Sequence, residues 1–177
     1  MWHWALELSR TRKARTAAVA AISPILDRSR HRLGGVPDAA WSDPYIFGFM
    51  IMLISIIARM EAGRIASHSL GKVQRRAWED ITRTNSDMMI EEMMLLDTTH
   101  DQKFELGCHN AAALGSMLLG SSFRDGGAMR EEHSRDVTGM QAIEPLAQRE
   151  DVSAAWIQFF EAYILTDRNQ DANAIAL

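Results

Sequence analysis

The sequence predicts an all-α fold, a single-domain bundle of about six to eight helices. Three observations support this prediction. The run from Tyr45 to Ala58 is almost entirely apolar, which is typical of a helix buried on every side. No stretch sustains the alternation of apolar and polar residues that marks a half-buried strand, and valine is scarce. Elsewhere, apolar residues recur at helical spacing.

The apolar run supplies the central helix of the predicted bundle. Asp43 is a candidate N-cap and Pro44 suits the first helical position, so we expect the helix to begin there and to run towards Ala66. A bilayer-spanning helix needs about 20 predominantly apolar residues, and this run ends at Arg59. We therefore expect a core helix in a protein that is not integral to a membrane. Gly48 would let a neighbouring helix approach closely.

A long basic helix is expected before the central one, from Trp2 to about Leu33, with a weak apolar face. Pro24 removes a backbone donor and should kink this helix or split it in two. The glycine pair after Leu33 then ends it. We interpret 1–35 as a basic helix that is separable from the remainder of the domain.

Four further helices are expected, over about 70–81, 88–96, 104–119 and from 151 onward. A break at 67–71 separates the first of them from the central helix. The segment 120–139 is rich in Gly, Ser, Arg and Glu, which predicts an irregular, flexible connection. The helix that begins at Asp151 carries a wide apolar stripe and is expected to pack firmly against the bundle.

Composition places the chain among ordinary globular proteins. Its 177 residues are 47% hydrophobic and 24% charged. The net charge of -4 hides an asymmetry, because residues 1–83 hold 13 Lys and Arg against 7 Asp and Glu, whereas the remainder holds 6 against 16. Such halves indicate an anionic partner, self-association, or helices that face each other within one chain. The single cysteine forms no internal disulfide, so we expect a cytoplasmic protein.

Possible metal ligands are concentrated in the second half of the chain. Glu105 and His109 are four residues apart and share a helix face, and with His100 they form the candidate metal site. Glu92 or His133 would have to complete it from other helices. The Glu-x-x-His spacing of di-iron bundles and the His-Glu-x-x-His motif are both absent from the sequence. A helical bundle that binds a metal or a small molecule is therefore the alternative interpretation, and the cofactor, if any, is unknown.

Signatures of catalysis are also missing. Cys108 lies on an apolar stripe, and the adjacent His109 points elsewhere on a helix, so a buried inert thiol is expected rather than a nucleophile. The sequence contains no Gly-x-Ser-x-Gly elbow and no phosphate-binding glycine loop. These absences favour a protein without enzymatic activity.

Basic residues of the first half form a candidate anion-binding face, namely Arg12, Arg15, Arg75 and Arg76. The isoelectric point near 5.8 and the absence of a recognition-helix pattern argue against a dedicated nucleic-acid-binding domain. Nucleic-acid binding through this face is the third interpretation.

The first interpretation is a non-catalytic interaction or regulatory module that binds a protein partner or a second copy of itself as a homodimer. Tryptophans outside the core commonly anchor partners, and methionines suit pliable interfaces. The candidate interaction residues are Trp2, Trp4, Trp41, Met89 and Met93.

Overall fold

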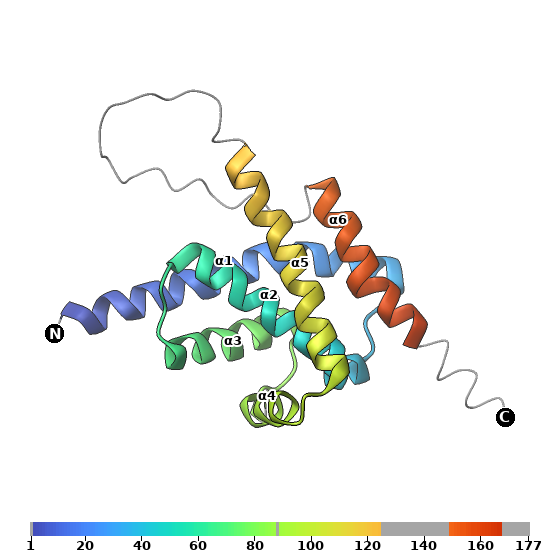
Figure 1. Ribbon diagram of the computed structural model, residues 1–177, viewed down its shortest axis with the longest axis horizontal. Coiled ribbons are helices and arrows are strands. Elements are labelled where there is room, and N and C mark those ends of the chain that lie inside the picture. Colours follow the sequence, from blue (N-terminus) through green and yellow to red (C-terminus); the bar gives the residue numbers. More distant parts are fainter. Residues whose placement is uncertain (1, 88, 125–148, 168–177) are drawn as a thin grey trace.

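A computed structural model describes residues 2–87, 89–124 and 149–167, with side chains for 7–87, 89, 91–118 and 149–167. Within these ranges the regular structure is entirely helical, which confirms the all-α prediction (Figure 1). The α-helices are α1 (Trp2–Leu33), α2 (Pro44–Ala62), α3 (Ser67–Thr82), α4 (Met89–Thr98), α5 (Gln102–Arg124) and α6 (Glu150–Trp156). A short 3-10 helix, η1 (Asp38–Ser42), precedes α2, and a π-helical segment, η3 (Ile157–Glu161), continues α6.

The predicted cap starts the central helix. Asp43 Oδ1 accepts hydrogen bonds from the backbone N–H groups of Tyr45 (2.9 Å) and Ile46 (3.2 Å), and Pro44 occupies the first turn of α2. These bonds satisfy backbone donors that have no partner inside the helix. Asp43 therefore fixes where α2 begins.

The end of α2 comes earlier than predicted. The chain turns at Gly63, which has a φ of 66° and donates its N–H to the Arg59 carbonyl at 2.9 Å. Glycine adopts this left-handed conformation without steric cost. The predicted break at 67–71 is wrong, because Ser67 already begins α3 and Gly71 lies inside that helix.

Two glycines bring the backbones of α2 and α5 into close contact. A Cβ on Gly48 would lie 2.5 Å from the Phe104 carbonyl oxygen, and one on Gly107 would lie 2.1 Å from the Tyr45 carbonyl oxygen. Neither distance is compatible with a side chain, so the glycines determine the helix crossing seen in Figure 1. The close approach predicted for Gly48 is thus found, and Gly107 provides its counterpart.

Helix α1 belongs to the same core as α2. Its residues Ala14, Ala18 and Ile22 are completely buried, and α1 lies against both α2 and α3. The predicted split at Pro24 does not occur, because α1 is one helix through that residue. The Pro24 ring is exposed while Ile25 beside it is buried, so packing on the core holds the two halves of the helix in line.

The last helix crosses the bundle near α5 (Figure 1). It runs from Glu150 through η3 to 162–167 without interruption, and Trp156 and Phe160 are completely buried. Helix α5 extends to Arg124, so the predicted irregular connection 120–139 begins later than expected, and its remainder lies outside the described residues.

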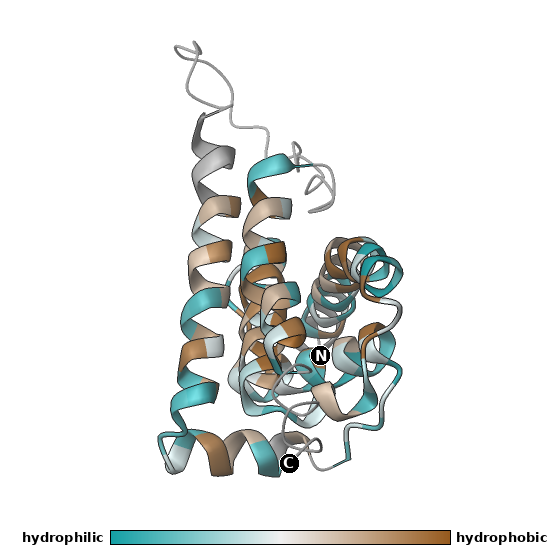
Figure 2. Cartoon of the chain, turned by 90° about the vertical axis from the view of Figure 1, so that its right-hand side faces the viewer, coloured by the Kyte–Doolittle hydropathy of each residue, from teal (hydrophilic) through white to brown (hydrophobic). Residues whose placement is uncertain are grey.

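Hydropathy along the ribbon agrees with this arrangement. Bands of hydrophobic and hydrophilic residues alternate along most helices (Figure 2), as expected for helices with one face on a core. Helix α2 differs, since its length and composition alone would allow it to cross a membrane. In this structure 67% of its most apolar window is buried inside the protein, which is the environment of a core helix.

Candidate functional site

A groove of about 310 Å³ opens where α2, α3, α4 and α5 meet. Its walls are mostly apolar and contain three methionines; the apolar lining consists of Ile51, Met52, Leu70, Met93, Met94 and Phe104. Each of the four helices contributes at least one lining residue. Because thioether side chains adapt to irregular shapes, this groove can fit more than one apolar surface.

Two polar residues of the groove wall, Ser55 and Gln74, bond to each other. Gln74 Nε2 donates to Ser55 Oγ at 2.8 Å, and Ser55 Oγ donates to the Ile51 carbonyl at 2.7 Å. Both side chains are buried, so these bonds remove the cost of leaving polar groups without partners. Ser55 and Gln74 therefore add little polarity to the groove.

Helix α4 exposes large apolar side chains at and beside the groove. Met94 lines the groove and Leu95 does not, yet both keep 63% of their surface exposed. Exposed apolar side chains at a groove edge are typical of interaction sites. Met94 therefore extends the apolar surface to the rim of the groove.

Charges are placed unevenly around the groove. Arg59 of α2 lines one wall and Asp97 of α4 lines another. Helix α4 also carries Glu91 and Glu92 and has no basic residue. The side formed by α4 is therefore acidic, whereas the α2 side presents a single cation.

Cys108 sits in the groove wall as an unreactive thiol. Its side chain is partly buried, and Sγ donates to the Gly48 carbonyl at 3.5 Å. Burial, together with the negative charges of Asp97 and Glu105, raises the pKa of the Cys108 thiol to about 11. Because the thiolate is the reactive form, this environment agrees with the predicted inert cysteine.

The five predicted interaction residues lie in different environments. Met93 lines the groove. Trp41 and Met89 retain only 6% and 3% of their surface and belong to the core. Trp2 and Trp4 belong to α1, but their side chains lie outside the described part of the structure. Of these five residues, Met93 is the one that lines the groove.

The predicted metal ligands lie on the exposed surface, where two of them are paired. His100 Nδ1 lies 3.1 Å from Glu105 Oε1, with side chains 83% and 57% exposed, and His109 is exposed on α5. Across 7–87, 89, 91–118 and 149–167, no three His, Cys, Asp or Glu residues gather as a metal site requires. Since His133 lies outside these ranges, the metal site stays a prediction.

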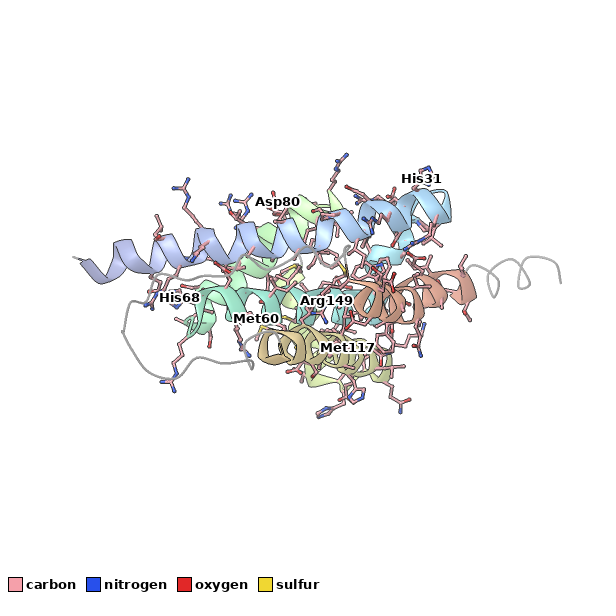
Figure 3. All side chains as sticks on the ribbon, turned by 90° about the horizontal axis from the view of Figure 1, so that it is seen from above. His31, Met60, His68, Asp80, Met117 and Arg149 are labelled. Atoms are coloured by element: carbon pink, nitrogen blue, oxygen red, sulfur yellow. The ribbon has the colours of Figure 1, made fainter. Side chains whose placement is uncertain are left out.

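The predicted anion-binding arginines lie on α1 and α3, which pack side by side. Arg15 forms a bidentate pair with Asp80, through Nε to Oδ2 at 2.6 Å and Nη2 to Oδ1 at 2.8 Å. Figure 3 labels Asp80 beside α1. Arg12 and Arg76 are exposed and Arg75 is partly buried, so one of the four charges is neutralised internally and anion binding stays a prediction.

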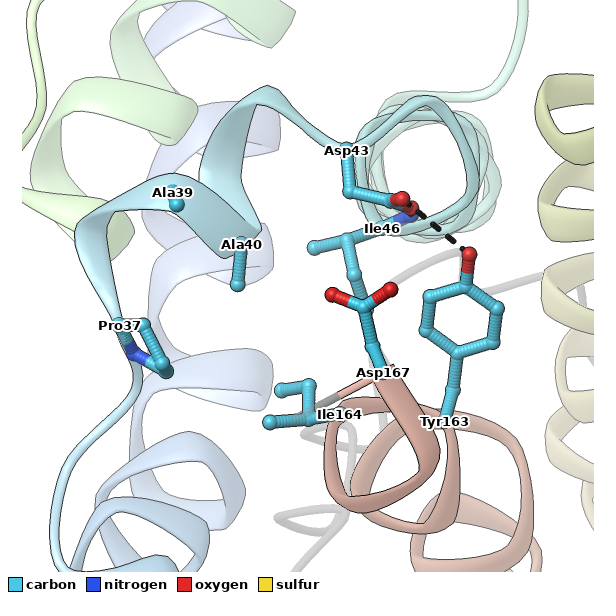
Figure 4. A pocket seen from close by; sticks show the side chains of 8 residues that line it. All are labelled: Pro37, Ala39, Ala40, Asp43, Ile46, Tyr163, Ile164 and Asp167. Atoms are coloured by element: carbon cyan, nitrogen blue, oxygen red, sulfur yellow. Dashed lines mark hydrogen bonds between the residues drawn. The ribbon is translucent and has the colours of Figure 1, made fainter. Parts of the chain in front are cut away.

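A second polar cluster joins the start of α2 to the last helix. Tyr163 donates to Asp43 Oδ2 at 3.2 Å, as Figure 4 shows, and Lys103 Nζ donates to the same oxygen at 3.3 Å. A pocket of about 50 Å³ adjoins this cluster. Hydrogen bonding to Tyr163 raises the pKa of Lys103, which keeps the ammonium charged.

The π-helical segment contributes a backbone acceptor to this cluster. Tyr45 OH donates to the Phe159 carbonyl at 2.7 Å and accepts from Asn110 Nδ2 at 2.9 Å. The Tyr45 and Tyr163 rings stack with centroids 3.9 Å apart, and burial raises the pKa of both phenols. With its groups engaged in this way, the cluster fastens the last helix to α2 and leaves little room for a ligand.

Sequence reasoning missed Ser55, Arg59 and Gln74 as residues of the groove. A weak signal was present, because Ser55 interrupts the apolar run and Gln74 lies between apolar positions of α3. Protein-family models, curated proteins and solved structures give no match to this chain. The groove is consequently the feature from which a function is argued.

Proposed function

We propose that this protein is a non-catalytic interaction module whose groove binds an amphipathic helix of a protein partner. The observation that carries the proposal is the Met-lined groove of about 310 Å³ between α2, α3, α4 and α5. Grooves between helices commonly accept the apolar face of a partner helix, and methionine-rich ones adapt to different sequences. The high pKa of Cys108, about 11, supports the non-catalytic part of the proposal.

The exposure of Met94 favours a helix over a small molecule. Met94 lies at the edge of the groove and keeps 63% of its surface exposed. A ligand confined to the cavity would leave much of this side chain in water. A helix lying along α4 would cover it, and burial of apolar area contributes about 25 cal/mol per Å².

The acidic residues near the groove indicate which charges the polar face of the partner helix carries. Asp97 lines the α4 side of the groove, α4 carries Glu91 without a basic residue, and Glu105 acts on the same region, since its charge raises the Cys108 pKa. Complementary charges guide association and suppress incorrect partners. The partner helix therefore carries Lys or Arg along the edge that faces α4.

Two synthetic amphipathic helices with the same leucine face test the proposal, one with a lysine-rich polar face and one with a glutamate-rich face. Isothermal titration calorimetry should show binding of the lysine peptide and little binding of the glutamate peptide. Met93→Glu should weaken binding of the lysine peptide at least about tenfold, since it places a charge in the apolar wall. Asp97→Lys should reduce the preference for the lysine peptide.

Met117→Glu is the matched control, because Met117 is a 40% exposed methionine of α5 outside the groove lining. This variant should bind the lysine peptide like wild type, and circular dichroism should confirm that both glutamate variants remain helical. Equal binding by Met93→Glu and Met117→Glu would contradict the proposal. Native mass spectrometry of the wild type can also reveal a dimer. If Met93→Glu dissociated this dimer and Met117→Glu did not, the occupant of the groove would be a second copy of this chain.

A further inference from the structure

A second cavity, of about 130 Å³, lies on the other side of α4. It is enclosed by η1, α2, α3, α4 and the turn after α3. Met89 and Glu92 of α4 line this cavity, whereas Met93 and Met94 line the groove. Pockets for drug-sized ligands measure about 300–1,000 Å³, so the occupant of this cavity has to be much smaller.

Three aromatic rings form the inner wall of the cavity, those of Trp41, Phe47 and Trp78. Trp78 packs edge-on against Trp41, with centroids 6.0 Å apart, and against Phe47 at 5.2 Å. Its indole Nε1 donates to Thr84 Oγ1 at 3.0 Å. The rings are therefore held in place, and the small parts of them that border the cavity can contact the alkyl groups of an organic cation.

The cavity carries unbalanced negative charge. Asp38 and Glu92 line it, and its lining contains no Lys, Arg or His. Among the described residues, neither carboxylate has an ion pair or a hydrogen bond from another side chain. The Ser42 hydroxyl adds a further hydrogen-bond acceptor.

We propose that this cavity binds a small organic cation of the alkylammonium class. The ammonium group is held by the Asp38 and Glu92 carboxylates, and its alkyl substituents lie against the aromatic wall. A hydrated divalent metal could use the same carboxylates but would make no use of the aromatic rings that line the cavity. This inference is independent of the partner proposed for the groove.

Titration with methylammonium chloride tests the proposal, followed through the indole N–H signals of Trp41 and Trp78 in ¹⁵N-labelled protein. These signals should shift in a saturable manner. Trp156 is the internal reference, because its indole donates to Ser29 and it does not line the cavity. Sodium chloride at equal ionic strength should not reproduce the shifts.

Glu92→Gln and Asp38→Asn should each weaken methylammonium binding at least about tenfold. Asp87→Asn is the matched control, because Asp87 is an exposed carboxylate that bonds to Asn85 and lies outside the lining; its affinity should equal that of wild type. Non-saturable shifts, shifts reproduced by sodium chloride, or equal affinities of Glu92→Gln and Asp87→Asn would overturn the proposal.

The same titration with Nα-acetyl-lysine amide identifies the source of the cation. Tighter binding than methylammonium would assign the cavity to a lysine side chain of a protein, and weaker binding would assign it to a free amine. Either result agrees with a cavity that binds an alkylammonium group. If neither methylammonium nor Nα-acetyl-lysine amide produced saturable shifts, the proposal would be excluded.

Discussion

At the scale of single residues, the position of Cys108 determines its chemistry. The thiol lies between the α2 backbone and the groove, and burial raises its pKa from 9.0 to about 11. The folded state therefore retains the thiol proton at pH values where an unfolded chain releases it. Between about pH 9 and about pH 11 the folded protein binds more protons than the unfolded protein, so stability falls as the pH rises through this window.

Comparison of wild type with Cys108→Ala over this pH window isolates the effect. The urea midpoint of wild type should decrease relative to that of Cys108→Ala as the pH rises from about 9 to about 11, because the other titrating groups cancel in the difference. Iodoacetamide should also alkylate the folded protein more slowly than the urea-unfolded protein near pH 8.5. A difference in midpoint that does not change with pH would contradict the raised pKa.

Residue chemistry was predictable where it depends on near neighbours in the chain. The Asp43 cap was predicted because it bonds to N–H groups two and three residues away. The burial of Trp41 was not, because it depends on Trp78 and Phe160, which are distant in sequence. Sequence spacing contains no information about such tertiary contacts.

At the scale of helices, the close approach of α2 and α5 depends on glycine. Gly107→Ala places a Cβ 2.1 Å from the Tyr45 carbonyl oxygen and 2.9 Å from the Phe49 nitrogen, and neither backbone atom can move without displacing α2. Overpacking of this kind costs about 1–3 kcal/mol or more. The free energy of unfolding in urea should decrease by at least that amount.

Gly71→Ala is the matched control for this substitution. Gly71 lies inside α3, and a Cβ there meets nothing within 4 Å. Alanine is a better helix former than glycine by about 1 kcal/mol, so this variant should be as stable as wild type or more stable. Equal destabilisation by the two substitutions would show that the helix crossing does not depend on Gly107.

Helix boundaries show where local signals compete. Gly71 lies in the predicted break and Gly63 lies before it, but of the two only Gly63 has a positive φ. Pro24 is a strong local signal for interruption, and α1 nevertheless continues because its flanking residues are packed in the core. Tertiary packing thus overrides a local preference at Pro24.

At the scale of the whole molecule, a buried ionic network joins the first helix to the last. Arg32 Nε donates to Glu161 Oε2 at 3.1 Å, and Ser29 Oγ donates to Glu161 Oε1 at 2.5 Å. Trp156 Nε1 in turn donates to Ser29 Oγ at 2.8 Å. The Glu161 side chain is 6% exposed, so these partners replace the water that a carboxylate would otherwise bind.

Arg32→Met removes the cation and leaves the Glu161 carboxylate buried. Loss of one partner from a buried pair costs about 3–5 kcal/mol; because Arg32 is 44% exposed, we expect a smaller loss, about 2 kcal/mol, in chemical denaturation. The double variant Arg32→Met/Glu161→Leu should recover most of it. Arg12→Met, at an exposed position of the same helix, should change stability by less than about 0.5 kcal/mol.

A double variant as unstable as Arg32→Met alone would contradict the role assigned to the buried charge.

The fold class and central helix were predictable because they depend on composition and periodicity. The groove was not, because it arises where faces of four helices meet, and helix spacing does not specify which faces those are. Met93 was identified from its Met-rich surroundings, whereas Arg59 and Gln74 lie on other helices. Arg59 and Gln74 reach the groove only because of the way the helices are arranged, and Gly48 and Gly107 help to determine that arrangement.

Helix α4 forms a wall of both the groove and the smaller cavity, since Met93 faces one and Glu92 the other. Two ligands that bind different faces of one short helix affect each other if either of them shifts its position. Thermodynamic linkage requires that each ligand change the affinity of the other by the same factor. The affinity for methylammonium can be measured with and without the lysine peptide, and the affinity for the peptide with and without methylammonium. Any allosteric coupling would change the two affinities by the same factor.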